Sequence, residues 1–228
     1  VVEAKGGGYT CVEIGAAGYQ AQELREVGYS AQEIVGALAE LRQGGTTCAD
    51  ARAQGYSLQE IKAAGYSCQE AKGARYTCKE ARDGGYSLQE IKAAGYVEGL
   101  KAAGFTCQEV KGAGYSCLEA KLGGYSSPEA KAAGYKLQEI KAGYVLGLKD
   151  AGYSCKEAKE AGYSCTEAKK AGYSCTEVKE AGYGCHEAQQ AGWSSQEGVR
   201  AGYACLAGLG WQWHMNTPLC TPEPRTAR

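Results

Sequence analysis

The chain has 228 residues, with 25 Lys and Arg against 26 Asp and Glu, and this balance excludes the basic surface that nucleic-acid binding requires. It contains 34 Gly but only one Phe and one Met, which is unlike the core of an ordinary globular domain. Because no run of about 18 apolar residues occurs, no membrane-spanning helix is expected. These features favour a single array of small repeats, in which neighbouring units stabilise one another.

A ten-residue repeat runs through almost the whole sequence. Its clearest copies follow one another from Ala151 to Gly182, each close to A-G-Y-S-C-K-E-A-K-E. All 17 Tyr and the only Phe fall at one position of this repeat, so the pattern is not a product of composition. Self-similarity at a fixed period is typical of a stacked repeat architecture. Twenty units can be counted at this ring position, at Tyr9, Tyr19, Tyr29, Thr46, Tyr56, Tyr66, Tyr76, Tyr86, Tyr96, Phe105, Tyr115, Tyr125, Tyr135, Tyr144, Tyr153, Tyr163, Tyr173, Tyr183, Trp193 and Tyr203.

Each unit carries the signals that start and stop a short helix. In one copy, Ser154 is a favourable N-cap and Glu157 stands three residues later, at the spacing of a capping box. Gly162 can end the helix because glycine readily adopts the left-handed conformation of a C′ residue. The pattern predicts a helix of roughly two turns, from about Cys155 to about Ala161.

A helix of this length needs neighbours, since isolated helices shorter than about 12 residues are marginal in water. Cys155, Ala158 and Ala161 lie on one side of the helix at i, i+3 and i+6, and they form a narrow apolar face. Tyr153 stands at N′, where it is expected to pack on Ala158 as a hydrophobic staple. We therefore predict an all-α solenoid of about twenty short two-turn helices over residues 1–205.

One unit, at 29–45, is longer than the others. The distance between ring positions is 17 residues here, and the apolar pattern after Ser30 predicts a helix that continues to about Gln43. The pair Gly44-Gly45 then supplies the expected stop signal.

Two stretches, near 96–105 and 135–153, are irregular. Three ring spacings shrink to nine residues there, and the units that begin at Tyr96 and Tyr144 lose the capping box. Because a shortened helix changes the direction in which the next one starts, we expect the array to bend at these stretches. Arg75 stands at a C′ position, where a side chain in the left-handed region costs about 1 kcal/mol, so this cap is predicted to be weaker.

The repeat decays over residues 206–228. Trp211 and Trp213 are expected to cover the exposed end of the array, since the terminal repeats of solenoids are atypical, and contact with a partner is the alternative. From Asn216 onward, prolines and scattered charges predict an extended tail.

Eleven of the twelve cysteines occupy the first helical position of their units. Because the same position holds Leu58, Leu88 and Leu137 in other units, we interpret the cysteines as small buried hydrophobic residues. Disulfides between neighbouring units are the alternative. No C-x2-C pair is present, so no metal site is predicted. The eleven are Cys11, Cys48, Cys68, Cys78, Cys107, Cys117, Cys155, Cys165, Cys175, Cys185 and Cys205.

No group of residues in the sequence indicates catalysis. His186 and His214 are the only histidines, and neither stands beside a Ser or Cys together with a third orienting group. The repeated glutamates are already explained by helix capping. We therefore expect no enzyme activity and no cofactor.

The repeated lysines and tyrosines each allow a second interpretation. The lysine two residues after the capping Glu, as at Lys159, Lys169 and Lys179, predicts a solvated face, and a comb of charges for a protein partner is the alternative. Rings at a fixed spacing could form the periodic surface of an ice-binding protein. The staple geometry turns the rings toward the helix, however, and this favours a structural role.

The pattern A-G-[YF]-[ST]-x-x-E-[AILV]-[KR] resembles the helical decapeptide repeats in the repeat region of the DotG/IcmE component of Dot/Icm type IV secretion systems. It is also similar to the tandem units of algal and protist repeat proteins. The resemblance covers the repeats only and implies a scaffold or spacer within a larger assembly. The cysteine at the first helical position and the Trp-rich end depart from the secretion-system form.

These observations predict a non-catalytic structural or scaffold protein, or a protein–protein interaction subunit of a larger assembly, with other proteins as partners. A peripheral or linker subunit of a membrane complex, for instance a photosynthetic one, is the first alternative, and an ice-binding protein is the second. The sequence begins at Val1 without Met. This start predicts either an incomplete sequence or an organellar or secreted protein whose targeting segment has been removed.

Overall fold

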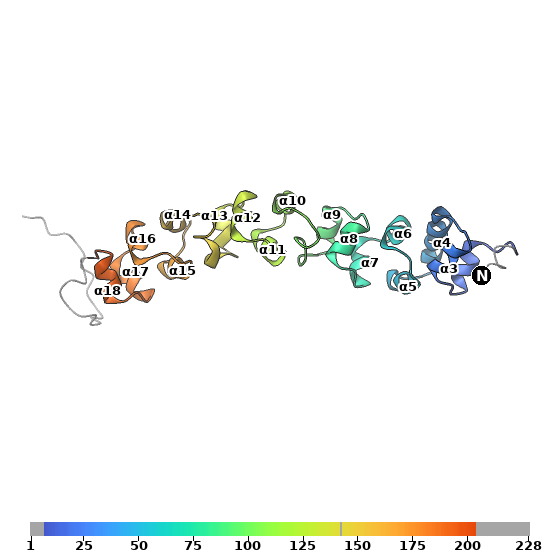
Figure 1. The fold of residues 1–228 in the computed structure, drawn as a ribbon, viewed down its shortest axis with the longest axis horizontal. Helices are drawn as coiled ribbons and strands as arrows, with labels where there is room; N and C mark the ends of the chain where they lie inside the picture. The colour runs from blue at the N-terminus through green and yellow to red at the C-terminus, as the bar shows by residue number, and fades with distance from the viewer. Residues whose placement is uncertain (1–6, 142, 204–228) are drawn as a thin grey trace, which may run out of the picture. The chain divides into compact units, whose positions relative to one another are not determined.

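The computed structural model describes residues 7–141 and 143–203 of the chain. It divides into two compact units, Val1–Gly152 and Tyr153–Arg228. The described residues form 17 α-helices and one 3-10 helix, without a strand (Figure 1). The all-α prediction is therefore confirmed, whereas the single array over residues 1–205 stays a prediction.

Almost all of the described helices have the same length of six residues. The exceptions are α4, with 13 residues, and α13, with five. The first unit holds α2 (Cys11–Ala16), α3 (Ala21–Glu26), α4 (Ala31–Gln43), α5 (Cys48–Ala53), α6 (Leu58–Ala63), α7 (Cys68–Gly73), α8 (Cys78–Asp83), α9 (Leu88–Ala93), α10 (Cys107–Gly112), α11 (Cys117–Leu122), α12 (Ser127–Ala132), α13 (Leu137–Lys141) and the 3-10 helix η1 (Val145–Gly147). The second unit holds α14 (Cys155–Glu160), α15 (Cys165–Lys170), α16 (Cys175–Glu180), α17 (Cys185–Gln190) and α18 (Ser195–Arg200).

Most of the described helices begin with the predicted capping box. At the start of α14, Ser154 N donates to Glu157 Oε2 over 2.7 Å, and Glu157 N donates to Ser154 Oγ over 3.2 Å. Ala161 is the C-cap, with a ψ of 3°, and Gly162 follows with a φ of +82°. The helix therefore ends at Glu160, one residue before the predicted end, because the backbone has already turned away from helical geometry at Ala161.

Many of the described helices pack against a helix two places further along the chain as well as against an immediate neighbour. In the first unit, α5 packs on α7 and α6 packs on α8, and in the second unit α14 packs on α16 and α15 on α17. The helices of each unit therefore form two rows. The structural period along a row is twenty residues, twice the period of the sequence.

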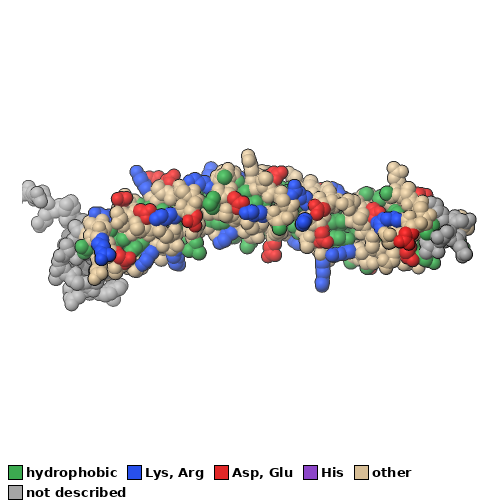
Figure 2. All heavy atoms as spheres, viewed as in Figure 1, with side chains coloured by type: hydrophobic (Ala, Val, Ile, Leu, Met, Phe, Trp, Pro, Cys, Tyr) green, Lys and Arg blue, Asp and Glu red, His purple; other side chains and the backbone are tan. Residues whose placement is uncertain are grey.

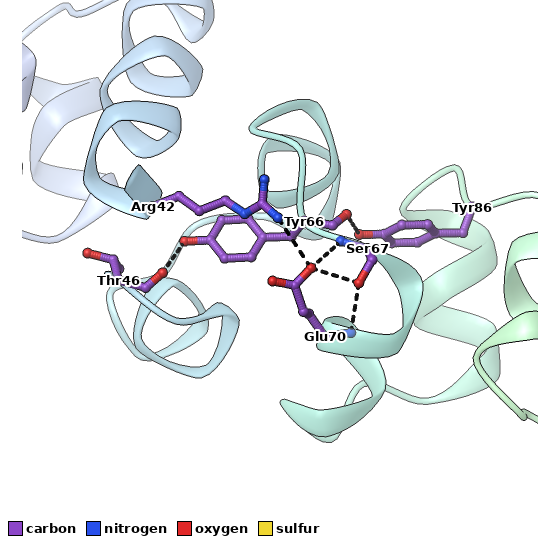
Figure 3. Close-up of polar contacts among 6 residues, drawn as sticks. All are labelled: Arg42, Thr46, Tyr66, Ser67, Glu70 and Tyr86. Atoms are coloured by element: carbon purple, nitrogen blue, oxygen red, sulfur yellow. Dashed lines mark hydrogen bonds and ion pairs between the residues drawn. The ribbon is translucent and has the colours of Figure 1, made fainter. Parts of the chain in front are cut away.

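The ring residues join the helices of one row. The hydroxyl of Tyr86 donates to the carbonyl oxygen of Tyr66 over 2.7 Å, and the hydroxyl of Tyr66 donates to that of Thr46 over 2.6 Å (Figure 3). Only 3% of Tyr66 and of Tyr86 is exposed. The predicted structural role of the rings is thus confirmed for these units, while Tyr9 and Tyr19 are exposed by 59% and 37%.

Beside the rings and the first-position cysteines, the core contains fully buried side chains at the fourth position of the helices. Ile61, Ile91 and Val110 have no exposed surface there, and Ala occupies the position in many other helices. Burying an aliphatic side chain of this size contributes about 1.5–3 kcal/mol. Units with Ile or Val at this position therefore add stability to the neighbouring units that have only Ala.

The long helix α4 has the predicted extent and a consequence for the next ring. It spans Ala31–Gln43, with Gly44 as its C-cap and Gly45 at a φ of +100°. The residue twenty places before Tyr56 is Gly36, which lies inside α4 rather than at a ring position. The buried hydroxyl of Tyr56 accordingly has no hydrogen-bond partner among the described residues.

The two stretches predicted to be irregular contain turns in place of six-residue helices. Residues 98–104 form a series of turns, and residues 145–147 form η1. Arg75 has a φ of +65°, the only positive value for a non-glycine residue in the described part of the chain, as its C′ position predicts. The expected bends of the array stay a prediction.

Candidate functional site

The fifth residue of most helices is Lys or Arg, and its side chain reaches the next helix of the same row, which is two helices further along the chain. Lys62 of α6 donates to the carbonyl oxygen of Gly85, just after α8. Its Nζ also lies 4.9 Å from the ring centre of Tyr86 and 3.5 Å from Oε2 of Glu90 in α9. One cation thus joins the end of one helix to the start of the next, an arrangement termed here a cation junction.

Figure 3 shows a cation junction formed by Arg42 near the end of α4. Its guanidinium lies 4.9 Å from the ring centre of Tyr66 and 3.5 Å from Oε2 of Glu70 (Figure 3). The same Glu70 oxygen accepts hydrogen bonds from the backbone N and the hydroxyl of Ser67, each over 2.7 Å. The carboxylate therefore caps α7 and faces the cation at the same time.

The arrangement recurs along the described chain. The cation lies between 4.3 and 6.0 Å from the ring centre in every further example. These pairs are Arg52 with Tyr76, Lys72 with Tyr96, Arg82 with Phe105, Lys92 with Tyr115, Lys101 with Tyr125, Lys111 with Tyr135, Lys121 with Tyr144, Lys159 with Tyr183 and Lys169 with Trp193.

A cation junction places positive charge where a helix end is negative. A cation near the last carbonyls of a helix contributes about 0.3–1 kcal/mol, and an exposed cation–π contact contributes a similar amount. The ion pair itself adds little, because Arg52 and Glu80, for example, are 40% and 44% exposed and exposed pairs contribute about 0–1 kcal/mol. Each junction therefore contributes little free energy by itself, and the stability of the stack increases with the number of junctions.

The lysines proposed from the sequence as partner-binding residues belong to these junctions in the second unit. Their side chains are partly or fully exposed, yet each ammonium group is bonded to a backbone carbonyl of a later helix end. Binding of a partner by this comb of charges stays a prediction. Lys159 donates to Gly182 O, Lys169 to Gly192 O over 2.5 Å, and Lys179 to Gly202 O over 2.5 Å.

The capping carboxylates are held in their ionised form. Hydrogen bonds from the backbone and the hydroxyl of Thr77 lower the pKa of Glu80 below its ordinary value. The hydrogen bond from Lys101 and those from Ser126 lower the pKa of Glu129 to about 2. These carboxylates are therefore negatively charged wherever the fold is intact near neutral pH.

The cysteines at the first helical position are buried in nearly every described unit. Burial raises the pKa of the Cys48 and Cys117 thiols to about 11 and that of Cys165 to about 12. A helix N-terminus lowers the pKa of a thiol, but loss of water outweighs this effect in such short helices. These thiols remain protonated and pack as small hydrophobic residues, as predicted. Cys185, by contrast, is disulfide-bonded.

The remaining residues considered from the sequence do not come together in one place. His186 is exposed on α17, with its Nε2 2.9 Å from Nε2 of Gln190. Among the residues that the structure describes, no three His, Cys, Asp or Glu side chains are arranged to hold a metal ion. His214, Trp211 and Trp213 lie outside the described residues.

Several exposed aliphatic side chains were not predicted from the sequence. Leu118 and Leu122 are four residues apart on α11 and are 44% and 56% exposed, while Leu146 in η1 is 74% exposed. The sequence does distinguish the α11 pair, because most other helices carry Gln, Ala or charged residues at the same two positions. On the face that Figure 2 shows, blue and red side chains are scattered among green and tan ones, without a large patch of one charge.

Within the described residues, no helix has both the length and the apolar character that crossing a membrane requires. The longest helix that the structure describes is α4, with 13 residues.

Comparison with known proteins gives one match. The family model described as "Decapeptide repeat region" matches residues 1–77, 37–98, 75–146 and 143–205, which together span nearly the whole array. No curated protein and no solved structure matches the chain. The matched residues are those that carry the ring position, the capping box and the glycine stop in the structure. The chain therefore belongs to the decapeptide repeat family.

Proposed function

We propose that the chain is a non-catalytic scaffold that holds other proteins within a larger assembly. The observation that supports this role is the use of the repeated polar groups inside the stack. Ring hydroxyls bond to backbone carbonyls, carboxylates bond to helix starts, and lysines bond to helix ends. The side chains that could perform chemistry are engaged in holding helices together, and a regular surface of the kind that solenoids use for binding is left.

The exposed leucines of α11 give this surface a distinct region. Leu118 and Leu122 are neighbours on the helix surface because they are four residues apart. Contiguous apolar groups on a protein surface mark interaction sites more often than scattered ones do. This pair supports contact of the first unit with another protein.

The two alternatives differ in how they relate to this proposal. A peripheral subunit of a membrane complex is a scaffold whose partner is that complex, so it remains a special case. The ice-binding alternative depends on the display of ring residues at a fixed spacing. The rings of Tyr66, Tyr86 and Tyr115 are each only 3% exposed, so they do not form such a surface.

Purification of the full chain from its source cell tests the proposal. The tagged chain is cross-linked in the cell, purified, and analysed by mass spectrometry for proteins in near-equal amount. A matched variant, Leu118→Gln with Leu122→Ala, carries the residues that α9 has at these positions, Gln89 and Ala93. We expect partner proteins with the wild-type chain and less of them with the variant. Recovery of a folded chain alone contradicts the proposal.

A further inference from the structure

Cys185 differs from the other cysteines that the structure describes. Nine of these carry thiols that are not in a disulfide, and all nine are buried, whereas Cys185 is disulfide-bonded and partly exposed. It begins α17, and the residue before it is Gly184, whereas α14, α15 and α16 each follow a capping Ser. Gly184 has no side chain that could cover the neighbouring sulfur. An oxidant can therefore reach the sulfur of Cys185, while the buried thiols are shielded.

The partner of Cys185 follows the described part of the chain, which ends at Tyr203. The chain has twelve cysteines. Nine of them carry thiols and Cys185 is the tenth, so its partner is one of the remaining two, Cys205 and Cys220. One of these two sulfurs therefore closes a loop back to the start of α17.

The contact between two ring residues favours Cys205 as the partner. The hydroxyl of Tyr203 donates to Tyr183 O over 3.0 Å. Tyr183 stands two residues before Cys185, and Tyr203 stands at the same distance before Cys205. Two residues of chain span at most about 7 Å, so Cys205 cannot lie far from the backbone of Tyr203. Cys220 follows Tyr203 by 17 residues, and the entropy lost on closing a loop increases with the length of the loop.

Regular units with cysteines at the same spacing of twenty residues contain no such bond. Cys48 and Cys68 begin α5 and α7, which pack on each other, yet both residues carry buried thiols. A capping box holds the start of each of these helices. In the unit of Cys205, Ala204 and Ala207 stand where regular units have the capping Ser and Glu. Cys205 therefore lacks the sequence signal that fixes the other cysteines at the start of a helix.

We infer that Cys185 and Cys205 form a disulfide that joins the start of α17 to the chain after α18. This bond does not depend on the scaffold function proposed above. It forms by two exchange steps with a small disulfide such as oxidised glutathione. The Cys185 thiolate attacks one sulfur of the oxidant and releases the other as a thiol, and the Cys205 thiolate then attacks Cys185 and releases the second thiol. The two protons and two electrons lost by the cysteines are carried away by the two released thiols.

The bond has consequences for stability and for the place where the protein works. It encloses α18 (Ser195–Arg200) in a closed loop, and a closed loop stabilises a fold chiefly by restricting the unfolded chain. Such bonds persist in oxidising compartments and are rare where glutathione keeps thiols reduced. We therefore expect the working protein in an oxidising compartment, and its buried thiols there stay reduced because an oxidant cannot reach them.

Cleavage at the single Met of the chain separates the two candidate partners. Cyanogen bromide cuts the full chain after Met215, between Cys205 and Cys220, in acid that suppresses disulfide exchange. Without reductant, we expect mass spectrometry to find the fragment 216–228 released. Iodoacetamide should alkylate ten of the twelve cysteines of the denatured, unreduced chain, all but the bonded pair. Retention of 216–228 on the rest of the chain, alkylation of all twelve cysteines, or a covalent dimer would overturn the inference.

Three variants test the effect of the bond on stability. Cys205→Ser should lower the thermal unfolding midpoint of the chain, and reductant should not lower it further. Cys220→Ser should keep the bond and the wild-type response to reductant. Cys175→Ser is the matched control, because its thiol is buried at the same repeat position in α16, and this variant should also keep that response. Equal midpoints for the oxidised and reduced wild-type chain, or a reduced Cys185 in acid-quenched source cells, would contradict the inference.

Discussion

Tyr86 and Tyr56 occupy the same position of the repeat and are equally buried, each with 3% exposed, but their hydroxyl groups differ. The hydroxyl of Tyr86 donates to Tyr66 O over 2.7 Å, whereas that of Tyr56 is buried and has no partner in the part of the chain that the structure describes. Burial raises the pKa of Tyr56 to about 12. The cause lies twenty residues earlier, where Tyr66 precedes a helix but Gly36 lies inside α4. The role of a ring is thus decided by the unit two places before it.

Removing either ring should have the largest effect. Tyr86→Ala and Tyr56→Ala each delete a buried aromatic side chain, and we expect each to lower the free energy of unfolding by about 3–5 kcal/mol. Urea unfolding of the full chain, followed by circular dichroism, measures this change. Tyr9→Ala is the control, since Tyr9 is 59% exposed and should matter much less. Similar losses for Tyr9→Ala and Tyr86→Ala would contradict the ring packing.

A methyl group added where α8 packs on α6 tests whether each helix packs on the helix two units before it. A Cβ atom on Gly84 would lie 2.7 Å from Cγ of Leu58, so Gly84→Ala should destabilise the chain by about 1–3 kcal/mol. Leu58→Ala in the same chain should relieve the strain. Gly73→Ala is the control, because its Cβ would meet nothing within 4 Å. Thermal unfolding distinguishes the variants, and an unchanged midpoint for Gly84→Ala would refute the contact.

Replacing the hydroxyl alone should separate the two tyrosines. Tyr86→Phe loses a hydrogen bond and should cost about 1 kcal/mol. Tyr56→Phe removes a buried hydroxyl that has no partner, so it should leave stability unchanged or raise it. The sequence already carries Phe105 at one ring position. Equal losses for the two Phe variants in urea unfolding would show that the hydroxyl of Tyr56 is also paired.

Protonation of a capping carboxylate should lower the stability of the chain least of all these changes. The loss should be the same in units whose ring hydroxyl is hydrogen-bonded and in units where it is not. The pKa of Glu129 falls from an ordinary 4.5 to about 2 in the folded chain. Because the folded pKa is the lower one, its stabilising effect is complete above about pH 4.5 and is lost as the pH falls toward 2. Glu129→Gln should flatten the pH dependence of the unfolding midpoint between pH 5 and 2. Glu26→Gln, outside any capping box, should not.

The local part of the fold could be predicted from the sequence. Ser154, Glu157 and Gly162 mark the ends of a helix by chemistry that acts within a few residues, and the structure places α14 between them. The extent of α4 and the left-handed conformation of Arg75 follow from similarly local signals. The burial of the cysteines was predictable because Leu takes the same position in other units.

The contacts between units could not be predicted in the same way. Consecutive units have nearly the same sequence, so nothing in them shows that Tyr86 bonds to Tyr66 rather than to Tyr76. For the same reason, the repeat pattern predicts a solvated face for Lys62, whereas its ammonium group bonds to the carbonyl oxygen of Gly85, after another helix.

The two-row arrangement also restricts how such a chain can lengthen by duplication. Adding one decapeptide within a unit moves every later helix of that unit into the opposite row, so each later surface residue exchanges its neighbours along the row. Adding two decapeptides returns all later helices to their former row. Lineages that keep a partner-binding surface should therefore gain or lose two decapeptides at a time, which is twenty residues in total.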